Sequence, residues 1–115
     1  MDDRRHLPRK YLIIYSRVFE RTMGKLLGYL DDLSLHGAMI ISEEKLVIGS
    51  TIELRLDLPD PQMFSKNNLY VNARVVRCDP DISPAFFNIG FEFLGVTQEQ
   101  KEIITKMMNA YEFKR

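Results

Sequence analysis

TIELRLDL, the stretch at residues 51–58, alternates polar and apolar side chains at every position. A period of two is typical of a β-strand that buries one face and exposes the other. Pro59 and Pro61 follow at once, and the strand is expected to end there because proline cannot donate to a strand ladder. The stretch therefore predicts half-buried β structure, with these side chains facing inward: Ile52, Leu54, Leu56 and Leu58.

Five further stretches have the β-branched, aromatic or alternating composition of strands and are separated by turn residues. They span residues 11–19, 26–30, 37–41, 69–78 and 86–94. The inward faces expected for the last two are Leu69, Val71, Ala73 and Val75, then Ile89, Phe91 and Phe93. The chain is expected to break between these two strands at Asp79, Pro80, Asp81 and Pro84.

The period changes to that of a helix near the carboxyl end. Thr97 and Gln100 have the spacing of a capping box. The apolar residues that follow at helical spacing are Ile103, Ile104, Met107, Met108 and Tyr111, and Lys114 and Arg115 suit the end of the helix dipole. Six strands over residues 11–95 and a helix over residues 97–113 predict a mainly β fold, a six-stranded antiparallel barrel with the helix packed on it.

Length and composition indicate one soluble domain over residues 1–115. A chain of 115 residues suits a single domain, and an apolar fraction of 45% excludes wholesale disorder. The longest apolar or aromatic run, residues 11–15, is far shorter than the roughly 18 residues of a membrane helix. Residues 2–5 are charged, so no signal peptide is expected. We therefore expect a cytoplasmic domain in which residues 1–10 form a flexible basic arm.

The charges and the cysteine count exclude several function classes. Sixteen basic residues balance sixteen acidic ones, which argues against a nucleic-acid binder that works by bulk electrostatics. Cys78 is the single cysteine and cannot form an internal disulfide, and with two histidines it makes a poor zinc inventory. No metal or cofactor is expected.

Asp32, Ser34 and His36 alternate, so on an extended segment they would share a face and resemble the inventory of a hydrolase triad. Same-face neighbours on a strand lie about 6.5 to 7 Å apart, whereas a nucleophile and its base need about 2.6 to 3.2 Å. No Gly-x-Ser-x-Gly elbow surrounds Ser34. A turn is the better interpretation, in which the Asp and Ser side chains cap backbone amides and Gly37 adopts a backbone angle that other residues avoid.

Two motifs in this order precede most of the strand pattern. Residues 5–9 read Arg-x-x-x-Arg, and residues 32–37 read Asp-x-Ser-x-x-Gly. Together with the closing strand IGFEF at residues 89–93 and the terminal helix, they make the chain resemble the PilZ domain, the bacterial receptor module for cyclic di-GMP. The resemblance extends over nearly the whole chain. It implies a six-stranded barrel with a carboxyl-terminal helix, here a stand-alone PilZ protein.

The resemblance implies that cyclic di-GMP is bound by Arg5, Arg9, Asp32, Ser34 and Gly37. An arginine fork can bind a phosphate or the O6/N7 edge of guanine, and it can stack on the base. Asp32 can accept hydrogen bonds from the guanine N1 and N2 groups. Ser34 offers a small hydroxyl, and Gly37 allows the ligand to approach the backbone closely.

Four more residues are candidates for this site. Within the family, the residue at the position of Arg4 is linked to whether one nucleotide or an intercalated pair is bound, and we expect two nucleotides per chain. The alternative for Arg4 is a solvated arm residue paired with a neighbouring aspartate. His36 is a further candidate, with packing or solvent exposure as its alternative, and so are Arg74 and Arg77, whose alternative is that of ordinary exposed strand charges.

The function that the resemblance implies is that of a non-enzymatic receptor. Its basic arm orders on the barrel when the nucleotide binds and thereby signals to a partner protein, in motility, exopolysaccharide or biofilm control. One alternative is a PilZ-like adaptor that binds a protein partner and no nucleotide, although such members typically lack the arginine pair. Another is a small barrel that binds single-stranded nucleic acid, which the zero net charge disfavours.

Overall fold

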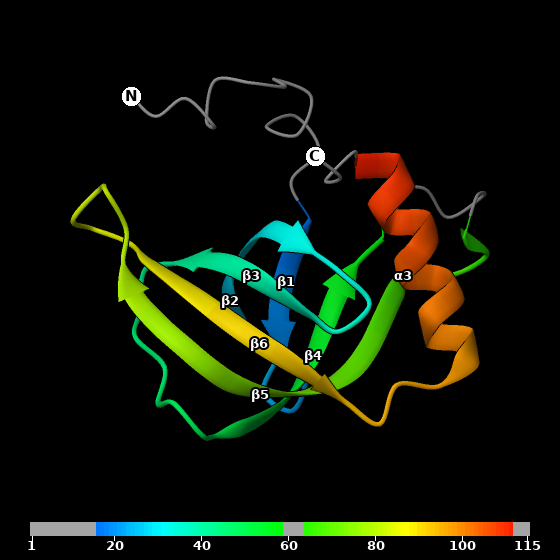
Figure 1. The fold of residues 1–115 in the computed structure, drawn as a ribbon, viewed down its shortest axis with the longest axis horizontal. Helices are drawn as coiled ribbons and strands as arrows, with labels where there is room; N and C mark the ends of the chain where they lie inside the picture. Colours follow the sequence, from blue (N-terminus) through cyan, green and yellow to red (C-terminus); the bar gives the residue numbers. More distant parts are fainter. Residues whose placement is uncertain (1–15, 59–63, 112–115) are drawn as a thin grey trace.

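Six strands and helix α3 form the framework of the computed structural model, which describes residues 16–58 and 64–111. Figure 1 shows the strands wrapped into a barrel with the helix lying along one side. The elements are β1 (Arg17–Glu20), β2 (Lys25–Leu33), β3 (Gly37–Ser42), β4 (Thr51–Asp57), β5 (Asn68–Pro80), β6 (Phe87–Leu94) and α3 (Gln98–Tyr111).

The strands are antiparallel neighbours in the order β1-β2-β3-β6-β5-β4, and the sheet closes because β1 pairs with both β2 and β4. The predicted six-stranded barrel is therefore confirmed. β5 and β6 form a long hairpin, visible in Figure 1 as the green and yellow strands. The pairing of β5 with β4 ends at Arg74, with Val75 bonded to the loop before β4, so the far end of the hairpin projects beyond β4.

The core lies where the alternating pattern placed it. Leu54 and Leu56 of β4 are fully buried, Leu58 is buried, and Ile52 is half-buried. The predicted inward faces of the last two strands are buried as well: Leu69, Val71, Ala73, Val75, Ile89, Phe91 and Phe93. Each fully buried leucine, isoleucine or phenylalanine stabilises the fold by about 1.5 to 3 kcal/mol relative to exposure, so this one-sided burial fixes the register of the strands.

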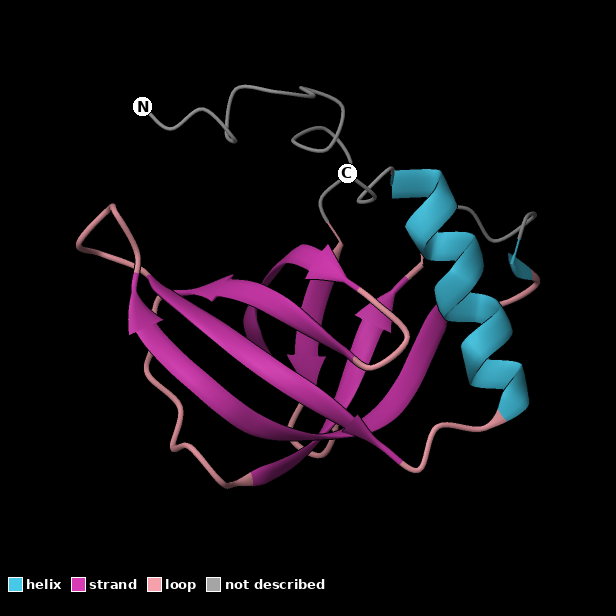
Figure 2. Ribbon diagram, viewed as in Figure 1, coloured by secondary structure: helices cyan, strands magenta, loops and turns pink. Residues whose placement is uncertain are grey.

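Helix α3 begins with the predicted capping box. The Gln100 backbone N–H donates to Thr97 Oγ1 at 3.1 Å, and the Thr97 backbone N–H donates to Gln100 Oε1 at 2.7 Å. Ile103, Ile104 and Met107 are buried in the core of the barrel. Figure 2 shows the helix lying beside the strands that it covers. The helix is described to Tyr111, and the expected end at residue 113, with Lys114 and Arg115, lies outside the described residues.

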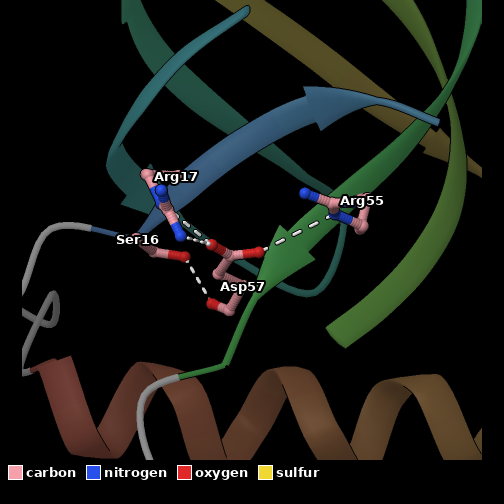
Figure 3. Close-up of polar contacts among 4 residues, drawn as sticks. All are labelled: Ser16, Arg17, Arg55 and Asp57. Atoms are coloured by element: carbon pink, nitrogen blue, oxygen red, sulfur yellow. Dashed lines mark hydrogen bonds and ion pairs between the residues drawn. The ribbon is translucent and has the colours of Figure 1, made fainter. Parts of the chain in front are cut away.

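The seam between β1 and β4 carries a polar cluster (Figure 3). Arg17 Nε donates to Asp57 Oδ2 at 3.0 Å, and Ser16 Oγ donates to the Asp57 carbonyl oxygen at 2.6 Å. The Arg55 guanidinium lies 4.0 Å above the Phe19 ring, and its Nε is 3.8 Å from Asp57 Oδ1. Each charge in this cluster faces an opposite charge or an aromatic ring, and the contacts join β1 to β4.

Two strands run further than predicted. β5 includes Asp79 and Pro80, which were expected to break the chain. Both residues pair with β6, and Pro80 is tolerated because it is the last residue of the strand, where no ladder donor is needed. β2 runs on to Leu33 and therefore contains Asp32. Of the first predicted strand, residues 17–19 lie in β1, and residues 11–15 lie outside the described residues.

Candidate functional site

The connection between β2 and β3 is a tight turn built by its own side chains. The Ser34 backbone N–H donates to the Gly37 carbonyl oxygen at 2.9 Å, and the His36 N–H donates to Ser34 Oγ at 3.2 Å. Asp32 Oδ1 accepts from the Leu33 N–H at 2.9 Å. The turn interpretation is confirmed, with Asp32 in the strand before it. The Ser34 hydroxyl bonds to backbone atoms of this turn, which does not support the hydrolase alternative.

Gly37 is required here for a reason other than the predicted one. Among the described glycines, Gly24, Gly49 and Gly95 have a positive φ, and Gly37 does not. Instead, a Cβ on Gly37 would collide with the Phe91 carbonyl oxygen of β6. The expectation of an unusual backbone angle was therefore wrong, and the glycine serves the close approach of two strands.

A groove of about 510 Å³ opens beside this turn. Its polar lining is formed by Asp32, Ser34, His36 and Glu92, and its apolar lining by Leu33, Ala38, Met39, Val76 and Phe91, with Gly37 among them. Strand register explains how the two carboxylates meet there. Met39 of β3 pairs with Asp32 on one side, and Gly37 of β3 pairs with Glu92 on the other. Asp32 and Glu92 therefore flank β3 from opposite sides.

The described lining of the groove is acidic, because it holds two carboxylates and neither lysine nor arginine. The nearest strand cations are already paired: Arg74 Nη2 lies 2.5 Å from Glu92 Oε1, and Arg77 Nε lies 2.6 Å from Asp79 Oδ2. Such a wall accepts hydrogen bonds from N–H donors and offers little to an anion. A phosphate placed here needs cations from other parts of the chain.

The structure brings together the part of the predicted site that it describes. Asp32, Ser34 and Gly37 line one groove, and His36 lines it with them, its side chain exposed. Arg74 reaches the groove through Glu92, whereas Arg77 lies further along β5, opposite Gly90. The predicted arm and its three candidates, Arg4, Arg5 and Arg9, lie outside the described residues.

Sequence reasoning missed Glu92, Met39 and Val76 as lining residues. The alternation of the closing strand predicts its inward face, Ile89, Phe91 and Phe93, whereas Glu92 lies on the outward face between the last two. The sequence does contain a signal for Glu92, since this residue lies within the closing strand IGFEF at residues 89–93. Val76 left no such signal, because it enters the groove beside an irregularity in the β5 ladder between Val75 and Arg77.

Other kinds of site find no support in the part of the chain that the structure describes. Residues 16–58 and 64–111 contain no group of three histidine, cysteine, aspartate or glutamate side chains placed to hold a metal ion. Within the same residues, no helix combines the length and apolar character needed to cross a membrane.

The comparison with protein families decides which fold family this barrel represents. The PilZ domain matches residues 3–110, which is nearly the whole chain. The chain belongs to the PilZ domain family. The matched range includes residues 5–9 and 32–37, the two stretches on which the resemblance was based. No curated protein matches the chain.

Three solved structures are similar to this chain in fold. The PilZ domain with c-di-GMP of YcgR from Escherichia coli is 17% identical with a TM-score of 0.62, covering 85% of this chain and 81% of that one. The Bacillus subtilis inhibitor of motility, MotI/DgrA, is 14% identical with a TM-score of 0.63, covering 88% of this chain and 47% of that one. MrkH of K. pneumonia in its apo state is 15% identical with a TM-score of 0.61, covering 85% and 46%. This PilZ chain therefore spans less than half of the MotI and MrkH chains.

Proposed function

We propose that this PilZ chain is a receptor for cyclic di-GMP whose site combines the groove with the amino-terminal arginines. The observation that carries the proposal is that Asp32, Ser34 and Gly37, the second family motif, lie together in the wall of one groove. Membership of the PilZ family and the similarity to a PilZ domain determined with c-di-GMP support the same ligand.

The charges of the site suggest that the groove and the amino-terminal arginines bind different parts of the ligand. The described wall presents the carboxylates of Asp32 and Glu92, which suit the N–H donors on a guanine edge. The two phosphates of the ligand need cations, and we assign that role to Arg5 and Arg9, whose forks can hold phosphate or stack on a base. His36, Arg74 and Arg77 remain further candidates around this set.

Chain connectivity supports the assignment of the arm. The Leu30 N–H donates to the Ser16 carbonyl oxygen at 2.8 Å. Ser16, the first described residue, therefore lies beside β2, next to a residue that is two positions before Asp32. Arg9 is seven positions before Ser16, and at about 3.3 to 3.6 Å per extended residue it can lie anywhere within roughly 25 Å of it. The groove beside Asp32 is within that reach.

We propose that signalling follows from binding rather than from catalysis. An arm that closes over the nucleotide changes the surface offered to a partner protein, and the binding energy offsets the entropic cost of ordering it. The protein would act in the cytoplasm, without a metal or cofactor, in the control of motility, exopolysaccharide production or biofilm formation. The description of the similar MotI as an inhibitor of motility is in keeping with such an output.

The test is a calorimetric titration of the purified chain with cyclic di-GMP, GTP and a short single-stranded oligonucleotide. We expect binding of cyclic di-GMP alone. Absence of any nucleotide binding would favour the adaptor function, and binding of the oligonucleotide would favour a nucleic-acid barrel.

A further inference from the structure

Glu92 is a charged residue of the groove that lies in the closing strand IGFEF and belongs to neither ligand motif, residues 5–9 or residues 32–37. Its Oε1 atom is 2.5 Å from Arg74 Nη2, and the two residues pair across β5 and β6. Both side chains are about half exposed, at 48% for Glu92 and 46% for Arg74, so ligand and solvent can reach them. Glu92 belongs to the lining of the groove, and Arg74 is joined to the groove through this ion pair.

The register places this pair in one row across three strands. Arg74 of β5 lies opposite Glu92 of β6, which lies opposite Gly37 of β3. On the far side of β3, Asp32 lies opposite Met39. The arrangement therefore gives the groove one carboxylate on each side of β3. It also gives the β6 carboxylate an arginine that holds it in place and offsets its charge.

We propose that Glu92 is a second specificity-determining residue of this site, which accepts hydrogen bonds from a guanine other than the one that Asp32 binds. The inference rests on the proposed function and adds to it. Cyclic di-GMP carries two guanines, each with an N1–H and an N2 amino group as neighbouring donors. A carboxylate is an acceptor with two oxygens and matches such a pair of donors, whereas an adenine edge does not offer the same pair. Arg74 is a positioning residue, because it acts on the base through Glu92.

The same chemistry explains why a negative charge is acceptable beside a dianionic ligand. An unpaired carboxylate near a phosphate is repulsive, but the guanidinium of Arg74 offsets the charge of Glu92 through their ion pair. The paired carboxylate of Glu92 still offers oxygen lone pairs that can accept hydrogen bonds in the groove. The site then favours guanine donors and disfavours ligands that bring only negative charge, such as inorganic phosphate.

The experiment compares cyclic di-GMP with cyclic di-IMP, which lacks the N2 amino groups and keeps the same charge and backbone. Calorimetry is carried out on the full chain and on Glu92→Gln. We expect the variant to bind cyclic di-GMP about tenfold more weakly and cyclic di-IMP no more than about threefold more weakly. The preference for guanine therefore falls, because the lost acceptor met the amino group.

Glu53→Gln is the matched control. Glu53 pairs with Arg21 at 2.6 Å, its side chain is 40% exposed, and it does not belong to the groove lining. We expect that variant to bind both ligands like the wild type. If the wild type binds cyclic di-GMP and Glu92→Gln retains the wild-type preference, the role of Glu92 is overturned while the receptor function stands. A wild type that binds no cyclic di-GMP overturns the proposed function itself.

Arg74→Gln tests the positioning role separately. We expect a loss of about fivefold for cyclic di-GMP together with a reduced preference over cyclic di-IMP, since Glu92 is then free to turn away. Equal weakening of both ligands would place Arg74 on a phosphate and overturn its action through Glu92.

Discussion

The carbonyl oxygen of Phe91 lies only 2.0 Å from the place that a Cβ on Gly37 would take. Strands β3 and β6 can therefore reach their observed spacing only if residue 37 is a glycine. This glycine is also the last position of the Asp-x-Ser-x-x-Gly motif. A Gly37 variant could therefore lose ligand binding because the two strands move apart. Such a loss does not by itself show that Gly37 contacts the ligand.

Gly37→Ala is expected to lower the free energy of unfolding by about 1 to 3 kcal/mol, as an inserted methyl group must displace backbone. Gly90→Ala is the comparison, because its Cβ would lie 3.2 Å from Arg77 Cβ, a tight but smaller conflict with a side chain. Urea denaturation of both variants measures the difference. Equal stability of Gly37→Ala and the wild type would contradict the close approach of the two strands.

Arg5→Ala and Arg9→Ala are each expected to weaken cyclic di-GMP binding ten- to a hundredfold. The loss of one charge-assisted fork costs about 1.5 to 3 kcal/mol. Both residues precede the described barrel, so the melting temperature should stay near that of the wild type. Calorimetric affinities within threefold of the wild type for both variants would remove the arm from the site.

Asp32→Ala is expected to weaken recognition of guanine more than recognition of phosphate. The carboxylate lines the groove as an acceptor, and a phosphate is repelled by it. The measurement compares cyclic di-GMP with cyclic di-AMP, which lacks the guanine N1 and N2 donors. A wild type that binds both ligands equally would show that Asp32 does not read the base.

Arg4 is expected to determine how many nucleotides bind. A second cyclic di-GMP brings two more negative charges and an exposed guanine face, and an arginine can offset the charge and stack on that face by roughly 1 to 2 kcal/mol. We expect two nucleotides per chain at saturation and one in Arg4→Leu. The stoichiometry is measured by calorimetry with active protein counted independently, and a value of one for the wild type would retire this role of Arg4 alone.

The helix is expected to depend more on its packing than on its cap. Ile104 is fully buried, so Ile104→Ala should cost about 2 to 5 kcal/mol of unfolding free energy. Thr97→Ala removes one half of the capping box and should cost about 1 kcal/mol. Thermal denaturation of both variants shows which substitution lowers the stability more. A larger effect of Thr97→Ala would mean that α3 is stabilised chiefly by its first turn.

The strands could be predicted because one-sided burial leaves a period of two in the sequence, most clearly at residues 51–58. The groove could be predicted only in part. Asp32, Ser34 and Gly37 are close in sequence and lie in or beside one turn, but Glu92 joins them through the pairing of β3 with β6. Local sequence does not encode which outward residues become neighbours across strands. The same limit concealed why Gly37 is a glycine, since the reason lies in β6.

β5 extends beyond the residues that pair with β4. This extension bears on whether a strand of another molecule can pair with β5. Among the described strands, residues 77–80 of β5 pair with β6 alone, so one side of this stretch is a sheet edge. Such an edge invites a strand of another chain, yet this one carries Arg77, Asp79 and Pro80. Charges and proline on an edge discourage intermolecular pairing. The hairpin is thus protected against edge-to-edge aggregation, and a peptide that extends the sheet at this edge is a poor choice of bait in a search for a partner.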